Sequence, residues 1–63
     1  MTTLDYEGSV PIKGRLAHLY YHARGDVYFA AFASGITTLH ALDQYDFADG
    51  DTPGEALSRL AMH

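Results

Sequence analysis

Two histidines that could bind a metal stand four residues apart, at His18 and His22. Imidazole nitrogens are common zinc ligands, and a zinc site takes three or four ligands. On a strand the two side chains would share a face with Tyr20, and His40 or His63 would have to complete the set. Strand histidines that face solvent or a partner explain the spacing more simply. We expect no metal and no cofactor, and keep a histidine-based metal protein or enzyme as an alternative.

Four carboxylates follow closely along the chain, at Asp43, Asp46, Asp49 and Asp51. An EF-hand calcium loop that began at Asp49 would place Leu60 at its twelfth position, where a bidentate Glu is required. The EF-hand hypothesis therefore fails, and an acidic segment exposed to solvent is the simpler interpretation.

The parts of a nucleophilic or phosphate-handling site are missing. The chain has no cysteine, and no serine stands in a G-x-S-x-G motif. No phosphate-binding loop or dinucleotide fingerprint is present. Arg24-Gly25-Asp26 matches an integrin-recognition tripeptide, but a tight hairpin explains this glycine and its neighbours. We expect that the protein is not an enzyme.

Charge is distributed unevenly along the chain, whose formal net charge is −4. Residues 1–24 contain three basic and two acidic side chains, whereas residues 25–63 contain six acidic side chains and Arg59 alone. Direct binding to nucleic acid normally needs a basic face, so we expect none. An acidic surface suits a basic protein partner, such as a nucleic-acid-binding protein or complex.

The chain is short, and its 63 residues are expected to form a single domain, residues 1–63. A core of this size gives marginal stability, and without cysteine no disulfide can add to it, so we expect a homodimer. The start of the chain, Met1 to Asp5, lacks the character of a signal peptide. No apolar run approaches the roughly 20 residues that span a bilayer. The expected location is the cytoplasm, or the host cytoplasm if a phage encodes the protein, with no membrane partner.

Three strands are expected in the first half of the chain. From Leu4 to Ile12 apolar residues alternate with polar ones and would share one face, and Pro11 predicts that this strand lies at a sheet edge or ends there. Residues 15–23 and 27–33 are rich in Tyr, Phe, Val and Leu, as strands are. A two-residue turn that contains Gly25, with positive φ at the glycine, joins them into a hairpin.

The register of this hairpin places apolar residues on both faces. One face carries Leu19, Tyr21, Tyr28, Ala30 and Phe32, and the other carries His18, Tyr20, His22, Val27 and Phe29. We therefore expect the hairpin to lie in the middle of the sheet or to have one face covered by a partner subunit.

The elements that follow are less regular. Ile36 to Leu42 opens with β-branched residues and predicts a fourth strand, although the spacing of Leu39, Leu42 and Tyr45 also fits a helix. The stretch from Asp43 to Asp51 is polar and turn-prone and predicts an acidic loop that contains Tyr45 and Phe47.

The last element is predicted to be a helix capped by Thr52, with Pro53 at its first position and Glu55 completing a capping box. Its apolar stripe consists of Ala56, Leu57, Leu60 and Ala61. The expected fold is α+β, a small antiparallel sheet of three to four strands with the C-terminal helix packed on one face.

Two segments resemble HicB-type antitoxins. Gly50-Asp51-Thr52-Pro53-Gly54-Glu55-Ala56-Leu57 is similar to the segment that opens the helix in that family. Gly25-Asp26-Val27-Tyr28-Phe29-Ala30-Ala31-Phe32 is similar to its glycine-led strand that ends in phenylalanine. The resemblance, over residues 25–32 and 50–57, implies a small sheet-and-helix domain that self-associates and blocks a small RNA-targeting toxin.

The expected function is that of a small acidic inhibitor that binds and blocks a basic, nucleic-acid-processing protein. Phage-encoded inhibitors of bacterial defence systems, such as anti-CRISPR proteins, often have this size and charge. A HicB-like antitoxin is the alternative. Aromatic side chains are enriched in binding surfaces, and the residues expected to contact the partner are Asp43, Tyr45, Asp46, Phe47, Asp49, Asp51, Tyr20 and Phe29.

Overall fold

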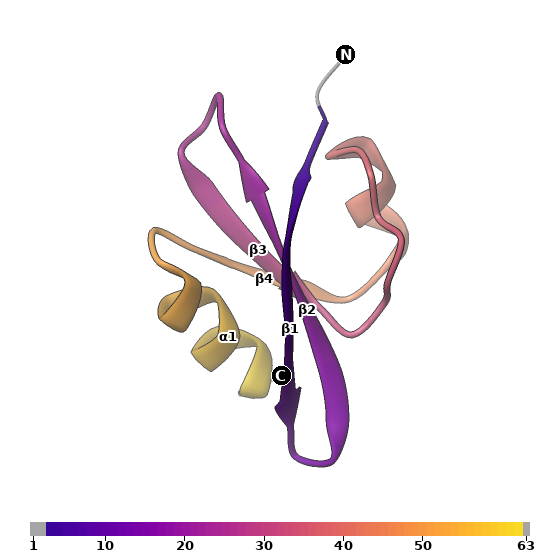
Figure 1. Ribbon diagram of the computed structural model, residues 1–63, viewed down its shortest axis with the longest axis vertical. Helices are drawn as coiled ribbons and strands as arrows, with labels where there is room; N and C mark the ends of the chain where they lie inside the picture. Colours follow the sequence, from indigo (N-terminus) through magenta and orange to yellow (C-terminus); the bar gives the residue numbers. More distant parts are fainter. Residues whose placement is uncertain (1–2, 63) are drawn as a thin grey trace.

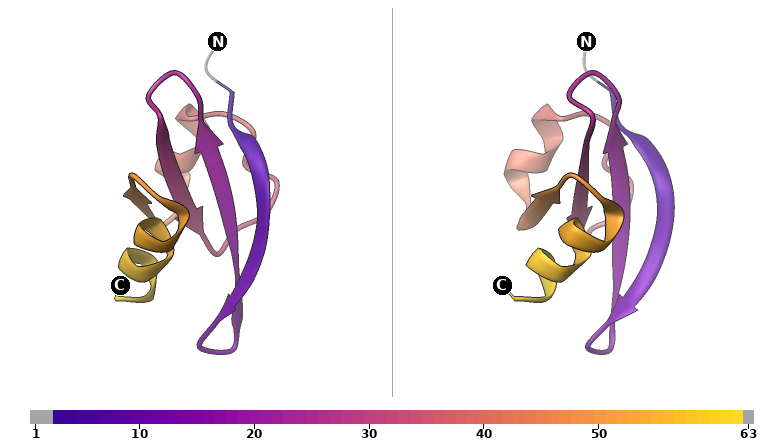
Figure 2. Two further views of the ribbon diagram at one scale, coloured as in Figure 1. Left: turned by 60° about the vertical axis from the view of Figure 1, so that its left-hand side comes forward. Right: turned by 90° about the vertical axis from the view of Figure 1, so that its left-hand side faces the viewer.

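The computed structural model describes residues 3–62, which form a four-stranded antiparallel sheet and two short helices. The strands lie in chain order: β1 (Asp5–Ile12), β2 (Arg15–His22), β3 (Val27–Ala31) and β4 (Phe47–Gly50). One face is covered by α1 (Pro53–Ala61), and the other by the segment 32–46, which contains the 3₁₀ helix η1 (His40–Gln44) (Figure 1). Two rotated views show the same layers (Figure 2). The expected α+β fold is confirmed.

Each face of the sheet has its own apolar cluster. The cluster under α1 consists of Ala17, Leu19, Ala30, Ala48, Ala56 and Leu60. The cluster under the segment 32–46 consists of Leu4, Tyr20, Phe29, Ala31, Ile36 and Leu42. Strands β2 and β3 contribute to both clusters and lie in the middle of the sheet, so the first of the two expectations for the hairpin is confirmed.

Strand β1 lies at a sheet edge and continues through Pro11 to Ile12, so the first of the two expectations from Pro11 is confirmed; proline has no N–H to donate to a second neighbouring strand. It is joined to β2 by a two-residue turn in which Lys13 and Gly14 have φ values of 51° and 81°. Positive φ at both central residues is typical of a type I′ hairpin turn, whose twist matches that of the flanking strands.

A β-bulge divides β1 into two parts. Its pairing with β2 changes register between Tyr6 and Gly8, where the glycine has a φ of 127°. The extra residue shifts the alternation of side chains by one. As a result Tyr6 pairs with Tyr20 on one face, whereas Val10 pairs with Ala17 on the other. The prediction that the apolar residues of this strand share one face is wrong.

The β2–β3 hairpin has the predicted register, with Tyr20 opposite Phe29, and its strands end one and two residues earlier than predicted. The turn differs from the prediction, because the residue with positive φ (50°) is Asp26 and not Gly25. Glycine is favoured at Gly25 for another reason. A Cβ atom there would lie 2.8 Å from Nδ1 of His22, so the imidazole would have to move.

The fourth strand lies elsewhere than predicted. Between Ile36 and Leu42 only Thr38 makes a β-bridge, an isolated one with Thr3, and the chain then enters η1. Leu42 is fully buried and Leu39 is half-buried against the core. The segment lies across the sheet and does not join its edge, so the helical spacing was the correct interpretation of its second half.

Strand β4 forms within the stretch that predicts an acidic loop. Asp and Gly are depleted in strands, which explains why the sequence pattern concealed it. Its inner face carries Ala48, which is 7% exposed, and Gly50, which faces α1. A Cβ atom on Gly50 would lie 2.6 Å from the backbone nitrogen of Ala56. Glycine at this position therefore lets β4 and the first turn of α1 approach each other closely.

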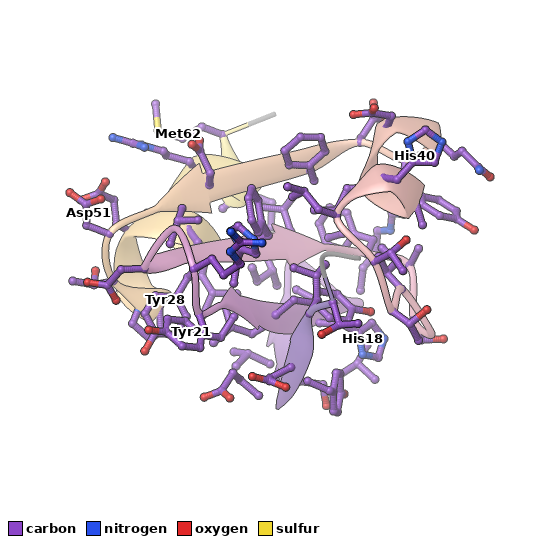
Figure 3. All side chains as sticks on the ribbon, turned by 90° about the horizontal axis from the view of Figure 1, so that it is seen from above. His18, Tyr21, Tyr28, His40, Asp51 and Met62 are labelled. Atoms are coloured by element: carbon purple, nitrogen blue, oxygen red, sulfur yellow. The ribbon has the colours of Figure 1, made fainter. Side chains whose placement is uncertain are left out.

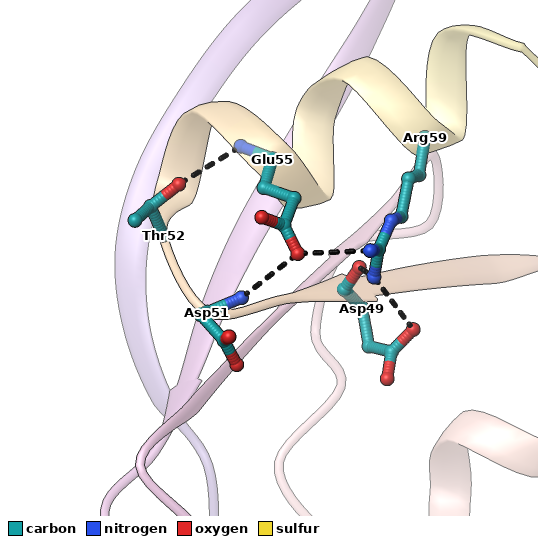
Figure 4. Close-up of polar contacts among 5 residues, drawn as sticks. All are labelled: Asp49, Asp51, Thr52, Glu55 and Arg59. Carbon is teal, nitrogen blue, oxygen red and sulfur yellow. Dashed lines mark hydrogen bonds and ion pairs between the residues drawn. The ribbon is translucent and has the colours of Figure 1, made fainter.

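Helix α1 begins as predicted. The hydroxyl of Thr52 accepts a hydrogen bond from the backbone nitrogen of Glu55, at 3.1 Å, and Pro53 is the first helical residue. The Glu55 carboxylate in turn accepts a hydrogen bond from the backbone nitrogen of Asp51, at 3.4 Å, one residue before the expected position (Figure 4). Two N–H groups near the helix start are thereby satisfied.

The inner side of α1 carries Ala56 and Leu60, which are buried, and Leu57 and Ala61, which are half-buried. The predicted apolar stripe is confirmed. In the described part of the chain, neither helix has the length and apolar character that crossing a membrane would require.

Candidate functional site

Residues 3–62 contain no group of three or more His, Cys, Asp or Glu side chains that could hold a metal. The imidazole of His18 is hydrogen-bonded to the hydroxyl of Tyr6, at 2.9 Å, and His22 packs against an aromatic ring of β3. His40 is exposed on η1, and His63 lies outside the described residues. The three described histidines thus have separate surroundings, and the surface chemistry left to consider is that of charged and aromatic groups.

The acidic stretch from Asp43 to Asp51 is not the single loop that the sequence predicts. Asp43 lies in η1, Asp46 lies just before β4, and Asp49 lies within β4. The prediction is wrong because residues 47–50 pair with β3. Strand β4 therefore separates the first two carboxylates from Asp51, which precedes α1.

Arg59 neutralises one part of this stretch. Its guanidinium lies 3.8 Å from the carboxylate of Asp49 and also donates a hydrogen bond to the backbone oxygen of that residue, at 2.9 Å. It lies 3.0 Å from the carboxylate of Glu55 as well (Figure 4). The other three aspartates of the stretch are exposed and form no ion pair within the described residues.

The aromatic residues predicted to contact a partner differ in exposure. Tyr45 is 45% exposed, and Phe47 is half-buried with its ring edge-on to Phe29, at 5.7 Å between centroids. Tyr20 and Phe29 are only 1% and 8% exposed. The prediction that these last two contact a partner is wrong, because the segment 32–46 covers their face of the sheet. The Tyr20 hydroxyl donates to the backbone oxygen of Ala33, at 2.8 Å, and burial raises its pKa.

A groove of about 450 Å³ lies where β2 begins and β3 has ended, and its volume is typical of small ligand sites. The guanidinium of Arg15 stacks on the ring of Phe32, 4.0 Å from its centroid. The groove is lined by Arg15, Phe32, Ala33, Tyr45, Asp46 and Leu60. It brings Tyr45 and Asp46, two residues expected to contact a partner, next to a cation that the sequence did not single out.

A second surface lies at the other end of the same strands. Tyr21 and Tyr28 are direct cross-strand partners, both half-buried, and their ring centroids are 4.8 Å apart. The hydroxyl of Tyr21 donates to the carboxylate of Asp26, at 2.9 Å, and this bond raises the pKa of Tyr21. Figure 3 shows the two rings side by side, on the same side of the molecule as Asp51.

Several carboxylates lie at the same end of the sheet as this tyrosine pair. Asp5 pairs with Tyr21 between β1 and β2, so the two side chains share a face. Glu7 is close enough to add to the rise in the pKa of Tyr21. Tyr28 pairs with Gly50, and an aspartate follows that glycine. We call this set of residues the tyrosine surface: Tyr21, Tyr28, Asp5, Glu7, Asp26 and Asp51.

Comparison of the chain with protein-family models, with curated proteins and with solved structures gives no match.

Proposed function

We propose that the chain is a non-enzymatic inhibitor that binds a basic, nucleic-acid-holding protein and blocks it by occupying its basic surface. The observation that carries the proposal is the number of unpaired carboxylates. Of the eight acidic residues, Asp49 and Glu55 pair with Arg59. The six others are exposed and form no ion pair within residues 3–62: Asp5, Glu7, Asp26, Asp43, Asp46 and Asp51.

The basic residues, by contrast, are largely engaged within the molecule. Arg59 is paired, Lys13 donates to the backbone oxygen of Ala61 at 2.9 Å, and Arg15 stacks on Phe32. The surface field is therefore dominated by carboxylates. Such a field raises the association rate with a basic partner and disfavours approach to phosphates. Carboxylates held on and around the sheet can compete with nucleic acid for the same lysines and arginines.

The proposal fits two biological settings. A phage-encoded inhibitor of a bacterial defence system, of the anti-CRISPR type, would act on a complex of the host. A HicB-like antitoxin would act on an RNA-targeting toxin encoded beside it. The genes that flank the coding sequence distinguish the two.

Affinity capture followed by displacement tests the proposal. The immobilised chain is exposed to a lysate of the source or host cell, and retained proteins are identified and purified. We expect a retained protein with a basic surface that releases a labelled RNA or DNA duplex at about one chain per binding protein. The chain alone should not retard the same duplex. A retained protein that keeps its duplex at saturating concentrations of the chain would contradict the proposal.

A further inference from the structure

The sheet face that α1 covers ends in two aromatic rings in contact, which both stay partly exposed although Tyr28 also packs against the cluster under α1. Helix α1 covers Leu19 and Ala30, the next inward-facing pair along β2 and β3, whereas Tyr21 and Tyr28 remain half-buried. Tyrosine rings attract cations through the negative potential of their faces. An aromatic pair at the open end of a sheet is therefore suited to a flat cationic group, and the charges around it decide which one.

The charges of the tyrosine surface favour a cation strongly. Its four carboxylates come from β1, from the β2–β3 turn and from the residue before the α1 cap, and none forms an ion pair within residues 3–62. Arg24, the basic residue of the same turn, is exposed and makes no ion pair with them in the described chain. The positive end of the α1 dipole lies nearby, but Asp51 and Glu55 stand at that end and offset it.

We propose that the tyrosine surface binds an arginine side chain of the partner's basic surface, which deepens the proposed function and rests on it. A guanidinium is planar, so it can lie on a tyrosine ring while its N–H groups donate to carboxylates at the rim. A lysine ammonium is a compact and strongly hydrated point charge that gains less from a ring. The Asp26 carboxylate is held in place by the Tyr21 hydroxyl, so one acceptor is positioned before binding, and the β1–β2 pairing places the backbone of Asp5 beside it.

The probes are two short peptides of equal length, one of arginine and one of lysine, each with a fluorescent label. Anisotropy titrations at low and at near-physiological salt give their dissociation constants. We expect the arginine peptide to bind about fivefold more tightly, because the cation–π contribution favours the guanidinium. The Tyr21→Leu/Tyr28→Leu variant should lose this preference, whereas Tyr45→Leu, which changes an exposed tyrosine of the groove, should keep it.

A second measurement on the unmodified chain does not depend on whether the variant folds. In nuclear magnetic resonance titrations with the arginine peptide, the ring resonances of Tyr21 and Tyr28 should shift most. Equal affinity for both peptides, or shifts centred on Asp43 and Asp46, would overturn the arginine site while leaving the proposed function standing. Absence of binding at low salt would overturn the arginine site too. The proposed function is tested separately, by the displacement assay, so its failure can be distinguished from failure of the arginine site.

Discussion

Tyr20 lies in the core cluster under the segment 32–46, where its side chain is almost fully buried and its hydroxyl donates a hydrogen bond to the backbone. Tyr20→Phe removes its hydrogen bond to the backbone oxygen of Ala33 without changing the ring. Because that oxygen is then left without this donor, we expect the free energy of unfolding at neutral pH to fall by about 1 kcal/mol. Urea denaturation followed by circular dichroism measures it, and equal midpoints would show that water replaces the bond at no cost.

The same hydroxyl makes stability depend on pH. Burial raises the pKa of Tyr20 above its usual range near 10, so the unfolded chain loses this proton first. The contribution of the protonated Tyr20 hydroxyl to the free energy of unfolding is therefore complete below about pH 10, and it is lost as pH rises through the folded-state pKa. We expect Tyr20→Phe to show a shallower loss of stability in this alkaline range. This variant should still lose some stability at alkaline pH, because the hydrogen bond to Asp26 also raises the pKa of Tyr21.

For single residues of the β2–β3 hairpin, the sequence correctly predicts which face of the sheet a side chain occupies. It does not predict which other element covers that face. The β2–β3 register correctly grouped Tyr20 with Phe29 and Tyr21 with Tyr28. Coverage depends on where α1 and the segment 32–46 pack, which is a long-range property. The first pair was therefore assigned wrongly to the surface, and the second pair was not singled out.

Because β4 and α1 lie in close contact at Gly50, adding one methyl group there is expected to lower the stability of the fold strongly. In Gly50→Ala the new Cβ would meet the backbone of the helix at 2.6 Å, and backbone cannot move aside as a flexible side chain can. We expect a loss of about 2 kcal/mol or more in unfolding free energy. The matched control is Gly54→Ala, in the first turn of α1, where nothing lies within 4 Å. That change should stabilise by up to about 1 kcal/mol, and similar melting temperatures for both variants would contradict the packing described.

The cap of α1 is tested by Thr52→Ala, which removes the acceptor for the backbone nitrogen of Glu55. We expect a cost of about 1 kcal/mol, a substantial part of the stability of so small a domain. Ser58→Ala is the control, because Ser58 is exposed in the same helix and alanine has the higher helix propensity. If thermal melts of Thr52→Ala and Ser58→Ala coincide, the cap contributes nothing.

Among the elements, those with strong local signals could be predicted and those set by tertiary contacts could not. The capping residues of α1, the turn at Gly14 and the three strands of the first half of the chain have local signals, and each is present, although the positive φ predicted at Gly25 is at Asp26. The bulge in β1, the path of residues 32–46 and the pairing of β4 depend on contacts distant in sequence. In β4, Asp49 and Gly50 are poor strand formers that pairing with β3 nevertheless holds extended.

For the whole molecule, the expectation of a homodimer remains a prediction. Both faces of the central hairpin are covered within one chain, so a partner subunit is not needed there. Tyr6 and Leu16, which lie on the same face of the sheet as Tyr20, are still 56% and 51% exposed, and they are the surface on which two copies would meet. Sedimentation at tens of micromolar should show about twice the mass of one chain. A single 6.9 kDa species would contradict the dimer.

The account as a whole depends on unpaired carboxylates acting in partner binding, and the association rate with the captured partner tests this most directly. Rim charges act mainly on that rate. Asp43→Asn/Asp46→Asn should slow association and flatten its salt dependence, while the melting temperature barely changes. The control, Asp49→Asn/Glu55→Gln, alters net charge equally but at carboxylates already paired with Arg59, and should slow association less. Rates and salt dependence of Asp43→Asn/Asp46→Asn that match the unmodified protein would contradict docking through the acidic stretch from Asp43 to Asp51.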